Sequence, residues 1–303
     1  MGTPEFSLPG FASLIKEKEF EIIGVYTQSD KATGRKQELT MPPVKVLARE
    51  NNLPVFQPEK IKTEIDNIKN LNPDLIVVIA YGQIIPPEIL TLPKFGCINI
   101  HASLLPKYRG AACLNAPILN GDKETGITIM KMEAGLDTGP ILHQEKIDLN
   151  GQEKLNDIHD RLATLSAKIL VPTLKAWLRG ELKENEQDNS IASYVRTIKK
   201  EDGKIDFKKP AAEIERLIRA YNPWPGSYGL LKGENLKIIE VKNEILAEND
   251  HKIGEFFIKN NELAIQCGQN SLLILKLQMP GKKALSTKEF LNGNKDIIGM
   301  IIE

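Results

Sequence analysis

Three polar side chains have the types and the spacing needed to stabilise an oxyanion and to move a proton. Asn99 and His101 lie two positions apart in the otherwise apolar run 97–101, which is typical of a buried β-strand. Side chains two apart on a strand share a face, so both groups can reach one substrate atom. Asp137 lies in the glycine-bounded turn 134–140. An amide, an imidazole and a carboxylate together suit oxyanion stabilisation and proton transfer.

Each of these features also has a structural explanation, which the residues alone leave open. Asn99 and His101 can satisfy backbone groups at the end of a strand, and an aspartate in a glycine-rich turn often caps the backbone. Their place in the chain favours a site. The run 97–101 leads into a loop, 103–110, and ligands of open α/β sheets bind beyond the carboxyl ends of strands.

The first part of the chain has the alternating pattern of an α/β domain. The continuously apolar run 75–79 is typical of a parallel strand that is buried on both faces, which requires helices on each side. The run 154–178 has the stripe of a long amphipathic helix. We therefore expect a doubly wound, mostly parallel sheet domain over residues 1–183. Its strands are expected at 21–27, 74–80 and 97–101, with a helix at 44–51.

The last hundred residues predict a second, smaller domain. The polar run 184–190 indicates an exposed linker, to which we assign residues 184–199. Beyond it a helix at 211–221 is followed by several short strands, which predicts a small antiparallel β-barrel, OB-like, over residues 200–303. These strands are expected at 237–241, 254–258, 263–267 and 272–277.

Charge and cysteine content limit the possible partners and compartment. Forty Lys and Arg residues balance forty Asp and Glu residues in 303, so a nucleic-acid partner would need local basic patches. Cys97, Cys113 and Cys267 are far apart and lack a C-x-x-C spacing, which argues against a disulfide framework and against a zinc site. No apolar run reaches the length of a membrane span. We expect a cytoplasmic protein without a bound metal.

The order of four short motifs narrows the chemistry further. Asn-Ile-His at 99–101, Ser-Leu-Leu-Pro-Lys-Tyr-Arg-Gly at 103–110, Thr-Gly-Ile-Thr at 125–128 and Leu-Asp-Thr-Gly at 136–139 resemble the folate-dependent formyltransferase superfamily. The resemblance covers nearly the whole chain. It narrows to the methionyl-tRNA formyltransferase family through Gly-Thr-Pro-Glu-Phe at 2–6, Thr-Gly-Arg-Lys at 33–36, Asn-Pro-Trp-Pro-Gly at 222–226 and Pro-Gly-Lys-Lys-Ala at 280–284.

This resemblance implies an activity and its partners. The expected reaction transfers a formyl group from 10-formyltetrahydrofolate, a co-substrate, to the α-amine of methionyl-initiator tRNA for translation initiation. No metal is implied, and a monomer is expected. A formyltransferase for a nucleotide-linked amino sugar remains the alternative. A dehydrogenase is disfavoured because the G-x-G-x-x-G fingerprint is absent, and glycinamide ribonucleotide formyltransferase because it lacks the second domain.

The resemblance also assigns roles to individual residues. Asn99, His101 and Asp137 match the three catalytic positions of the superfamily. Arg35 and Lys36, in the polar loop 30–41, are expected to contact the tRNA, together with the second domain; the alternative for this loop is a solvent-exposed segment without a partner. The backbone of two segments is expected to line the folate pocket: Gln83, Ile84 and Ile85 in one, and Ser103, Leu104, Leu105 and Pro106 in the other.

Two stretches call for separate expectations. The Pro-Trp-Pro stretch at 223–225 reads most directly as a rigid interdomain turn with a buried indole. The chain reaches Gly2 without the short apolar strand that precedes this motif in the family. Because the first strand of a doubly wound sheet is central, its loss would leave neighbouring strands unpaired, and we expect such a strand to precede Met1.

Overall fold

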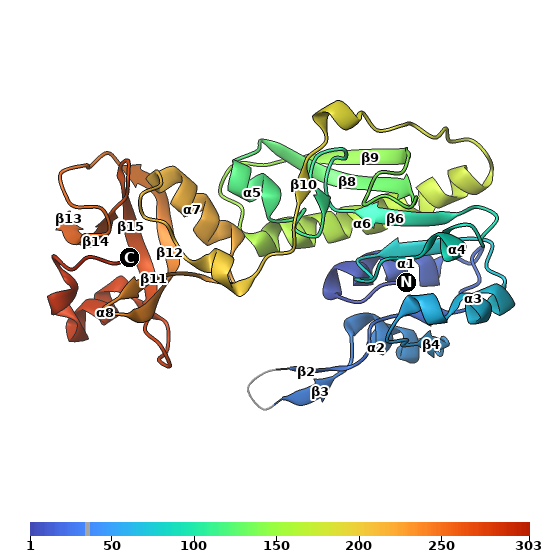
Figure 1. The fold of residues 1–303 in the computed structure, drawn as a ribbon, viewed down its shortest axis with the longest axis horizontal. Helices are drawn as coiled ribbons and strands as arrows, with labels where there is room; N and C mark the ends of the chain where they lie inside the picture. Colours follow the sequence, from blue (N-terminus) through green and yellow to red (C-terminus); the bar gives the residue numbers. More distant parts are fainter. Residues whose placement is uncertain (34–36) are drawn as a thin grey trace. The chain divides into compact units, whose positions relative to one another are not determined.

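The computed structural model describes residues 1–33 and 37–303 and divides into two compact units (Figure 1). Unit 1 comprises Met1–Cys113, Glu124–Asp148 and Ile158–Val195, and unit 2 comprises Leu114–Lys123, Leu149–Asp157 and Arg196–Glu303. Two short segments before Val195 therefore belong to unit 2, and the remainder of unit 2 follows Val195. Simple sequence ranges do not anticipate these two excursions.

The main sheet of unit 1 is mixed. Strand β6 (Cys97–His101), whose bounds match the sequence prediction, pairs in parallel with β5 (Ile76–Ile79). On its other side β6 pairs antiparallel with β8 (Glu124–Lys131), which pairs antiparallel with β9 (Ile141–Asp148). The expectation of a mostly parallel sheet therefore fails on this side. Only nine residues join β8 to β9, which is too few for the crossover that parallel neighbours require.

Helices cover both faces of the sheet in unit 1. Val25 in β1 (Val25–Tyr26), which pairs in parallel with β4 (Val55–Phe56), packs in one apolar cluster with Phe11 and Val44. The next residue, Tyr26, packs in another cluster on the opposite face. The first face is covered by α1 (Leu8–Lys16) and α2 (Pro43–Glu50), and the second by α3 (Ile65–Leu71) and α4 (Pro87–Leu90).

The long helix α6 (Leu155–Leu178) buries the predicted apolar stripe, including Ile158, Leu162 and Ile169. It lies close to α1, because a Cβ on Gly10 would overlap the Ile79 side chain and contact Leu170. Among the described residues, no helix combines the length and the apolarity that crossing a bilayer requires.

Residues 1–3 lie between β1 and β5. The Gly2 N–H donates to the Tyr26 carbonyl at 3.0 Å, and the Ile79 N–H donates to the Met1 carbonyl at 2.9 Å. Behind Met1 lies a cavity of about 750 Å³, whose wall includes Val25 and Val77 from the two flanking strands.

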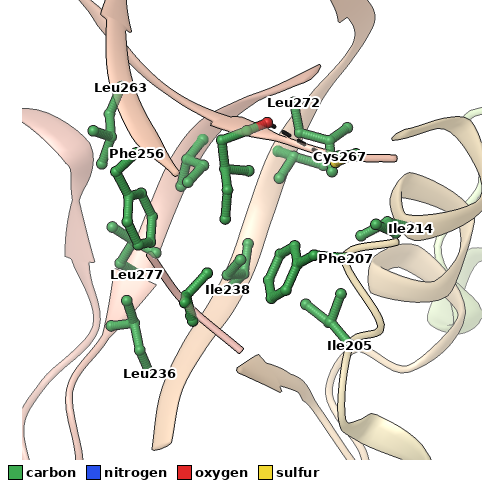
Figure 2. Packing of buried hydrophobic residues seen from close by; sticks show 14 of the residues in the cluster. Ile205, Phe207, Ile214, Leu236, Ile238, Phe256, Leu263, Cys267, Leu272 and Leu277 are labelled. Atoms are coloured by element: carbon green, nitrogen blue, oxygen red, sulfur yellow. Dashed lines mark hydrogen bonds between the residues drawn. The ribbon is translucent and has the colours of Figure 1, made fainter. Parts of the chain in front are cut away.

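Unit 2 is built on an antiparallel sheet that packs against helix α7 (Ala211–Ala220). Figure 2 shows Phe207 and Phe256 among the aliphatic side chains of its core. The sheet order is β11 (Ser227–Leu231), β12 (Glu234–Leu246), β15 (Ser271–Gln278), β14 (Glu262–Gln266) and β13 (Phe256–Lys259), with β16 (Leu285–Ser286) beside β15. The helices α5 (Ala116–Asn120) and α8 (Thr287–Gly293) complete the unit.

The expected closed barrel does not form among the strands of residues 196–303. Edge strands β11 and β13 do not pair with each other, and the C-terminal residues cover both edges instead. Leu230 exchanges backbone hydrogen bonds with Glu303, and Phe256 exchanges them with Met300 and Gly299. The sheet is therefore open in its strand order, although the C-terminal residues pair with one residue on each edge strand.

Trp224 does not match the expected buried indole. Its side chain is 54% exposed, and the Pro-Trp-Pro turn lies within unit 2, between α7 and β11, rather than between units. The Gly226 N–H closes this turn by donating to the Tyr221 carbonyl at 2.9 Å. A tight surface turn directs its central side chain outward, which explains the exposure.

Candidate active site

His101 and Asp137 meet at the carboxyl end of β6. His101 Nε2 lies 2.9 Å from the Tyr108 carbonyl oxygen. That oxygen can only accept, so Nε2 carries a hydrogen and Nδ1 is the nitrogen that exchanges a proton. Nδ1 lies 3.6 Å from Asp137 Oδ2. The structure thus brings together two residues that are far apart in the sequence.

The Asp137 turn is held in an unusual backbone shape. Asp137 has a φ of +52°, a left-handed conformation that aspartate tolerates better than most residues. Its Oδ2 accepts a hydrogen bond from the Gly110 N–H at 2.8 Å. A Cβ on Gly139 would overlap the Lys131 carbonyl, so the turn requires glycine there. The carboxylate therefore has the structural role that the sequence left open, and it also faces His101.

Asn99 lies on the same face of β6 as His101, because the strand has no irregularity between them. Its side chain is half-buried, and within residues 1–33 and 37–303 no hydrogen-bond partner of its amide is recorded. The structural explanation, that Asn99 satisfies backbone groups, does not apply. Its amide is available to a ligand.

The expected folate segment 103–106 is shaped by two polar residues that sequence analysis did not single out. Thr128 Oγ1 donates to the Ser103 carbonyl at 2.6 Å and accepts from the Leu105 N–H at 3.0 Å. Gln144 Nε2 donates to the Leu105 carbonyl at 2.8 Å. Ser103 and Leu105 have buried side chains. Thr128 lies in one of the four motifs, whereas Gln144 carries no local signal.

The other expected folate segment leaves from the same edge of the sheet, because β5 and β6 are parallel neighbours. The Gln83 side chain is engaged by the protein, since its Oε1 accepts from the Ile61 N–H at 2.7 Å. Ile85 is buried in the core. Ile84 is 90% exposed, so of these three residues it is the one whose side chain is open to a ligand.

Side-chain hydrogen bonds connect the loops that follow β1 and β5 at this edge of the sheet. Gln28 Nε2 donates to the Tyr81 and Gly82 carbonyls at 3.2 and 3.0 Å. Lys45 Nζ lies 2.7 Å from an Asp30 carboxylate oxygen. Hydrogen bonds from Lys45 and Gln57 hold the pKa of Asp30 below its usual value. A hairpin of β2 (Lys31–Thr33) and β3 (Glu38–Thr40) projects from unit 1 here (Figure 1).

The expected tRNA contacts Arg35 and Lys36 lie outside the described residues. In the polar run 184–190, which was expected to be exposed, every residue except Gln187 is exposed. Gln187 is only 8% exposed, and β10 (Tyr194–Val195) pairs in parallel with β7 (Arg109–Gly110), next to the site. The burial of Gln187 was not predicted, because sequence patterns do not reveal long-range polar contacts.

Comparison with known proteins identifies the family of this chain. Residues 2–174 match the family model described as formyl transferase, and residues 197–295 match the formyl transferase C-terminal domain. A methionyl-tRNA formyltransferase from Geobacter sulfurreducens is 46% identical over 97% of this chain and 92% of its own. One from Caldanaerobacter subterraneus is 44% identical over 100% of this chain and 98% of its own.

Among solved structures, the sugar 3N-formyl transferase WlaRD gives a TM-score of 0.67 at 23% identity, covering 93% of this chain and 97% of that one. HypX from Aquifex aeolicus gives 0.60 at 16% identity, over 89% of this chain and 47% of that one. At such identities these two show a shared fold alone. The full-length relatives and both domain matches show that the chain belongs to the methionyl-tRNA formyltransferase family.

Proposed function

We propose that Asn99, His101 and Asp137 catalyse the transfer of a formyl group from 10-formyltetrahydrofolate to the α-amine of methionyl-initiator tRNA. The observation that carries this proposal is the 3.6 Å approach of His101 Nδ1 to Asp137, beside an Asn99 amide on the same strand face. His101 can then carry a proton, and the Asn99 amide can donate a hydrogen bond, at one position for the reacting carbon.

The reaction forms and breaks one bond at the formyl carbon. The neutral amine attacks this carbon, and the carbonyl oxygen becomes an oxyanion, which the Asn99 amide and protonated His101 stabilise by donating hydrogen bonds. The attacking nitrogen then loses a proton. The folate N10 gains a proton and leaves, which gives formylmethionyl-tRNA and tetrahydrofolate. His101 and Asp137 carry protons between these two nitrogens.

The amine needs little activation. An α-amine titrates at about 7.7 to 8.0, so a useful fraction is neutral near pH 7. Asp137 is therefore assigned to orienting His101 and relaying protons rather than to acting as a strong base. The Tyr108 carbonyl, by fixing the hydrogen on Nε2, keeps Nδ1 as the exchanging nitrogen.

A folate donor is supported by the relatives and by the site. WlaRD was solved with 5-N-formyl-THF, and HypX with tetrahydrofolic acid. In this chain the backbone of 83–85 and 103–106 leaves the same sheet edge as His101, and the exposed Ile84 side chain offers an apolar contact to a planar ring. The tRNA is proposed to contact Arg35, Lys36 and unit 2. We further propose that the protein acts as a cytoplasmic monomer, with 184–199 joining its two domains.

One assay separates this function from the amino-sugar alternative. Purified protein is supplied with 10-formyltetrahydrofolate and either methionyl-initiator tRNA or a nucleotide-linked amino sugar, and formylated product is measured. The proposal predicts product with the tRNA, in amounts that exceed the sugar product. Efficient formylation of the sugar alone would overturn it.

A further inference from the structure

Residues 185–195, called the strap below, bind both loops that form the site. Asn185 exchanges backbone hydrogen bonds with Ile141, directly after the Asp137 turn, at 2.8 and 3.0 Å. Further along, the Arg109 N–H donates to the Ser193 carbonyl at 2.8 Å, and the Ala111 N–H donates to the Val195 carbonyl at 3.1 Å. The strap therefore spans from the turn that carries Asp137 to the loop that follows His101.

Gln187 is the side chain in the strap that joins these two loops. Its Nε2 donates to the Asp137 carbonyl at 2.9 Å and to the Gly139 carbonyl at 2.7 Å. Its Oε1 accepts from Arg109 Nε at 3.1 Å and from Arg109 Nη2 at 2.8 Å. The amide thus uses both donors and both acceptor positions, and it does so while almost fully buried.

The strap holds the two site residues whose backbones are strained. Tyr108 has a φ of +63° and Asp137 has a φ of +52°, conformations that persist in non-glycine residues only when their surroundings hold them. The Tyr108 N–H donates to Ser193 Oγ at 2.9 Å, while Gln187 binds the Asp137 carbonyl. Tyr108 and Asp137 supply the two groups that face the His101 ring.

Arg109 explains why the strap folds here. Its side chain is 1% exposed, yet among the described residues no carboxylate forms an ion pair with it. Its remaining partners are neutral groups of the strap: Asn189 Oδ1 at 2.8 Å and the Tyr194 hydroxyl at 2.9 Å. A buried guanidinium is costly unless it is hydrogen-bonded, so Arg109 ties the strap to the loop that precedes Gly110.

We infer that Gln187 is a positioning residue for the formyl transfer, which acts by holding Asp137 against His101 Nδ1. The inference rests on the role proposed above for Asp137. Gln187 touches neither reacting group. Its two donated hydrogen bonds fix the backbone of the Asp137 turn. Its two accepted hydrogen bonds connect that turn to Arg109. The next residue, Gly110, donates its N–H to the Asp137 carboxylate.

The test separates positioning from stability with matched variants. Gln187→Glu keeps an acceptor for Arg109 but replaces the amide donor with an oxygen that repels the Asp137 and Gly139 carbonyls. Asn189→Ala and Tyr194→Phe are controls, since each removes one Arg109 partner and leaves the Asp137 turn intact. The kcat and both KM values are measured with methionyl-tRNA and 10-formyltetrahydrofolate, and the Tm is measured for every variant.

Coupling to Asp137 is measured in a second background. Asp137→Asn keeps a side chain that tolerates the left-handed backbone and can still accept from Gly110. If Gln187 acts through Asp137, Gln187→Glu lowers kcat by about tenfold or more in the natural background, with KM values little changed. In the Asp137→Asn background it lowers kcat by less than about twofold.

The outcomes are distinct. A Gln187→Glu enzyme with near-normal kcat, or one with the same fractional loss in both backgrounds, overturns the inference and leaves the proposed function standing. Full turnover in Asp137→Asn overturns the role of Asp137 and the inference with it. If Gln187→Glu folds poorly, the double variant Arg109→Met, Gln187→Met is used instead. It removes the buried charge together with its partner, and its kcat is compared in the natural and Asp137→Asn backgrounds.

Discussion

His101 Nδ1 and Asp137 Oδ2 lie 3.6 Å apart, although His101 ends strand β6 and Asp137 lies in the turn between β8 and β9. The same carboxylate oxygen accepts from the Gly110 N–H, and the other ring nitrogen of His101 faces the Tyr108 carbonyl. The imidazole is thus placed between a backbone acceptor that fixes its tautomer and a carboxylate that can relay its proton.

The Asn99 amide is predicted to act as an oxyanion donor. Asn99→Ala and Asn99→Asp are expected to fold normally and to lower kcat by about a hundredfold, since each removes the N–H₂ donor from the strand face. Steady-state kinetics at saturating substrates and a thermal melt provide the measurement. A kcat within about threefold of the natural protein would exclude this role for Asn99.

The Asp137 turn is predicted to require glycine at position 139. In Gly139→Ala the new Cβ overlaps the Lys131 carbonyl, so the turn must shift and kcat should fall by about tenfold or more. Gly293→Ala is the control, because a Cβ there meets nothing within 4 Å. Equal activity of the two variants would show that the turn adapts without displacing Asp137.

Sequence alone predicted the elements whose signals are local. The bounds of β6 follow from a short, mostly apolar run, and the buried face of α6 follows from its helical stripe. The family resemblance predicted that His101 and Asp137 act together. Their spacing in the sequence could not predict this. Gln187 and Gln144 were missed because each contacts residues far away in the sequence, and neither disturbs an apolar pattern. Trp224 was misjudged because residue type does not reveal which way a turn directs its side chain.

Burial lowers the pKa of the Met1 amine to about 5, from its usual 8.0. The unfolded chain therefore binds this proton more tightly, so stability is lost as pH falls from about 8 to 5. This group alone contributes about 4 kcal/mol to that change. Acetylation turns the Met1 amine into an uncharged amide, so it should remove this pH dependence.

Urea titrations of the acetylated and the unmodified chain across this pH range provide the measurement. The acetylated chain is expected to lose less stability than the unmodified chain, and the difference between them should grow as pH falls. A difference that does not depend on pH would contradict the burial of the amine.

Arg35 is predicted to contact a tRNA phosphate. Arg35→Ala should raise KM for methionyl-tRNA, leave folate affinity unchanged, and reduce the slope of log K against log salt by about one unit. Arg179→Ala, which removes a guanidinium paired with Glu181, is the charge-matched control. Unchanged tRNA kinetics and salt slope would remove Arg35 from the interface, and a selective loss of folate affinity would assign it to the other substrate.

The most direct test of the account is the turnover of His101→Ala at saturating 10-formyltetrahydrofolate and methionyl-initiator tRNA. His101 is the residue on which the oxyanion contact and the proton relay both depend. The account predicts an unchanged fold by thermal melt and a kcat lowered by about a hundredfold or more. A folded His101→Ala protein with near-normal kcat would contradict it.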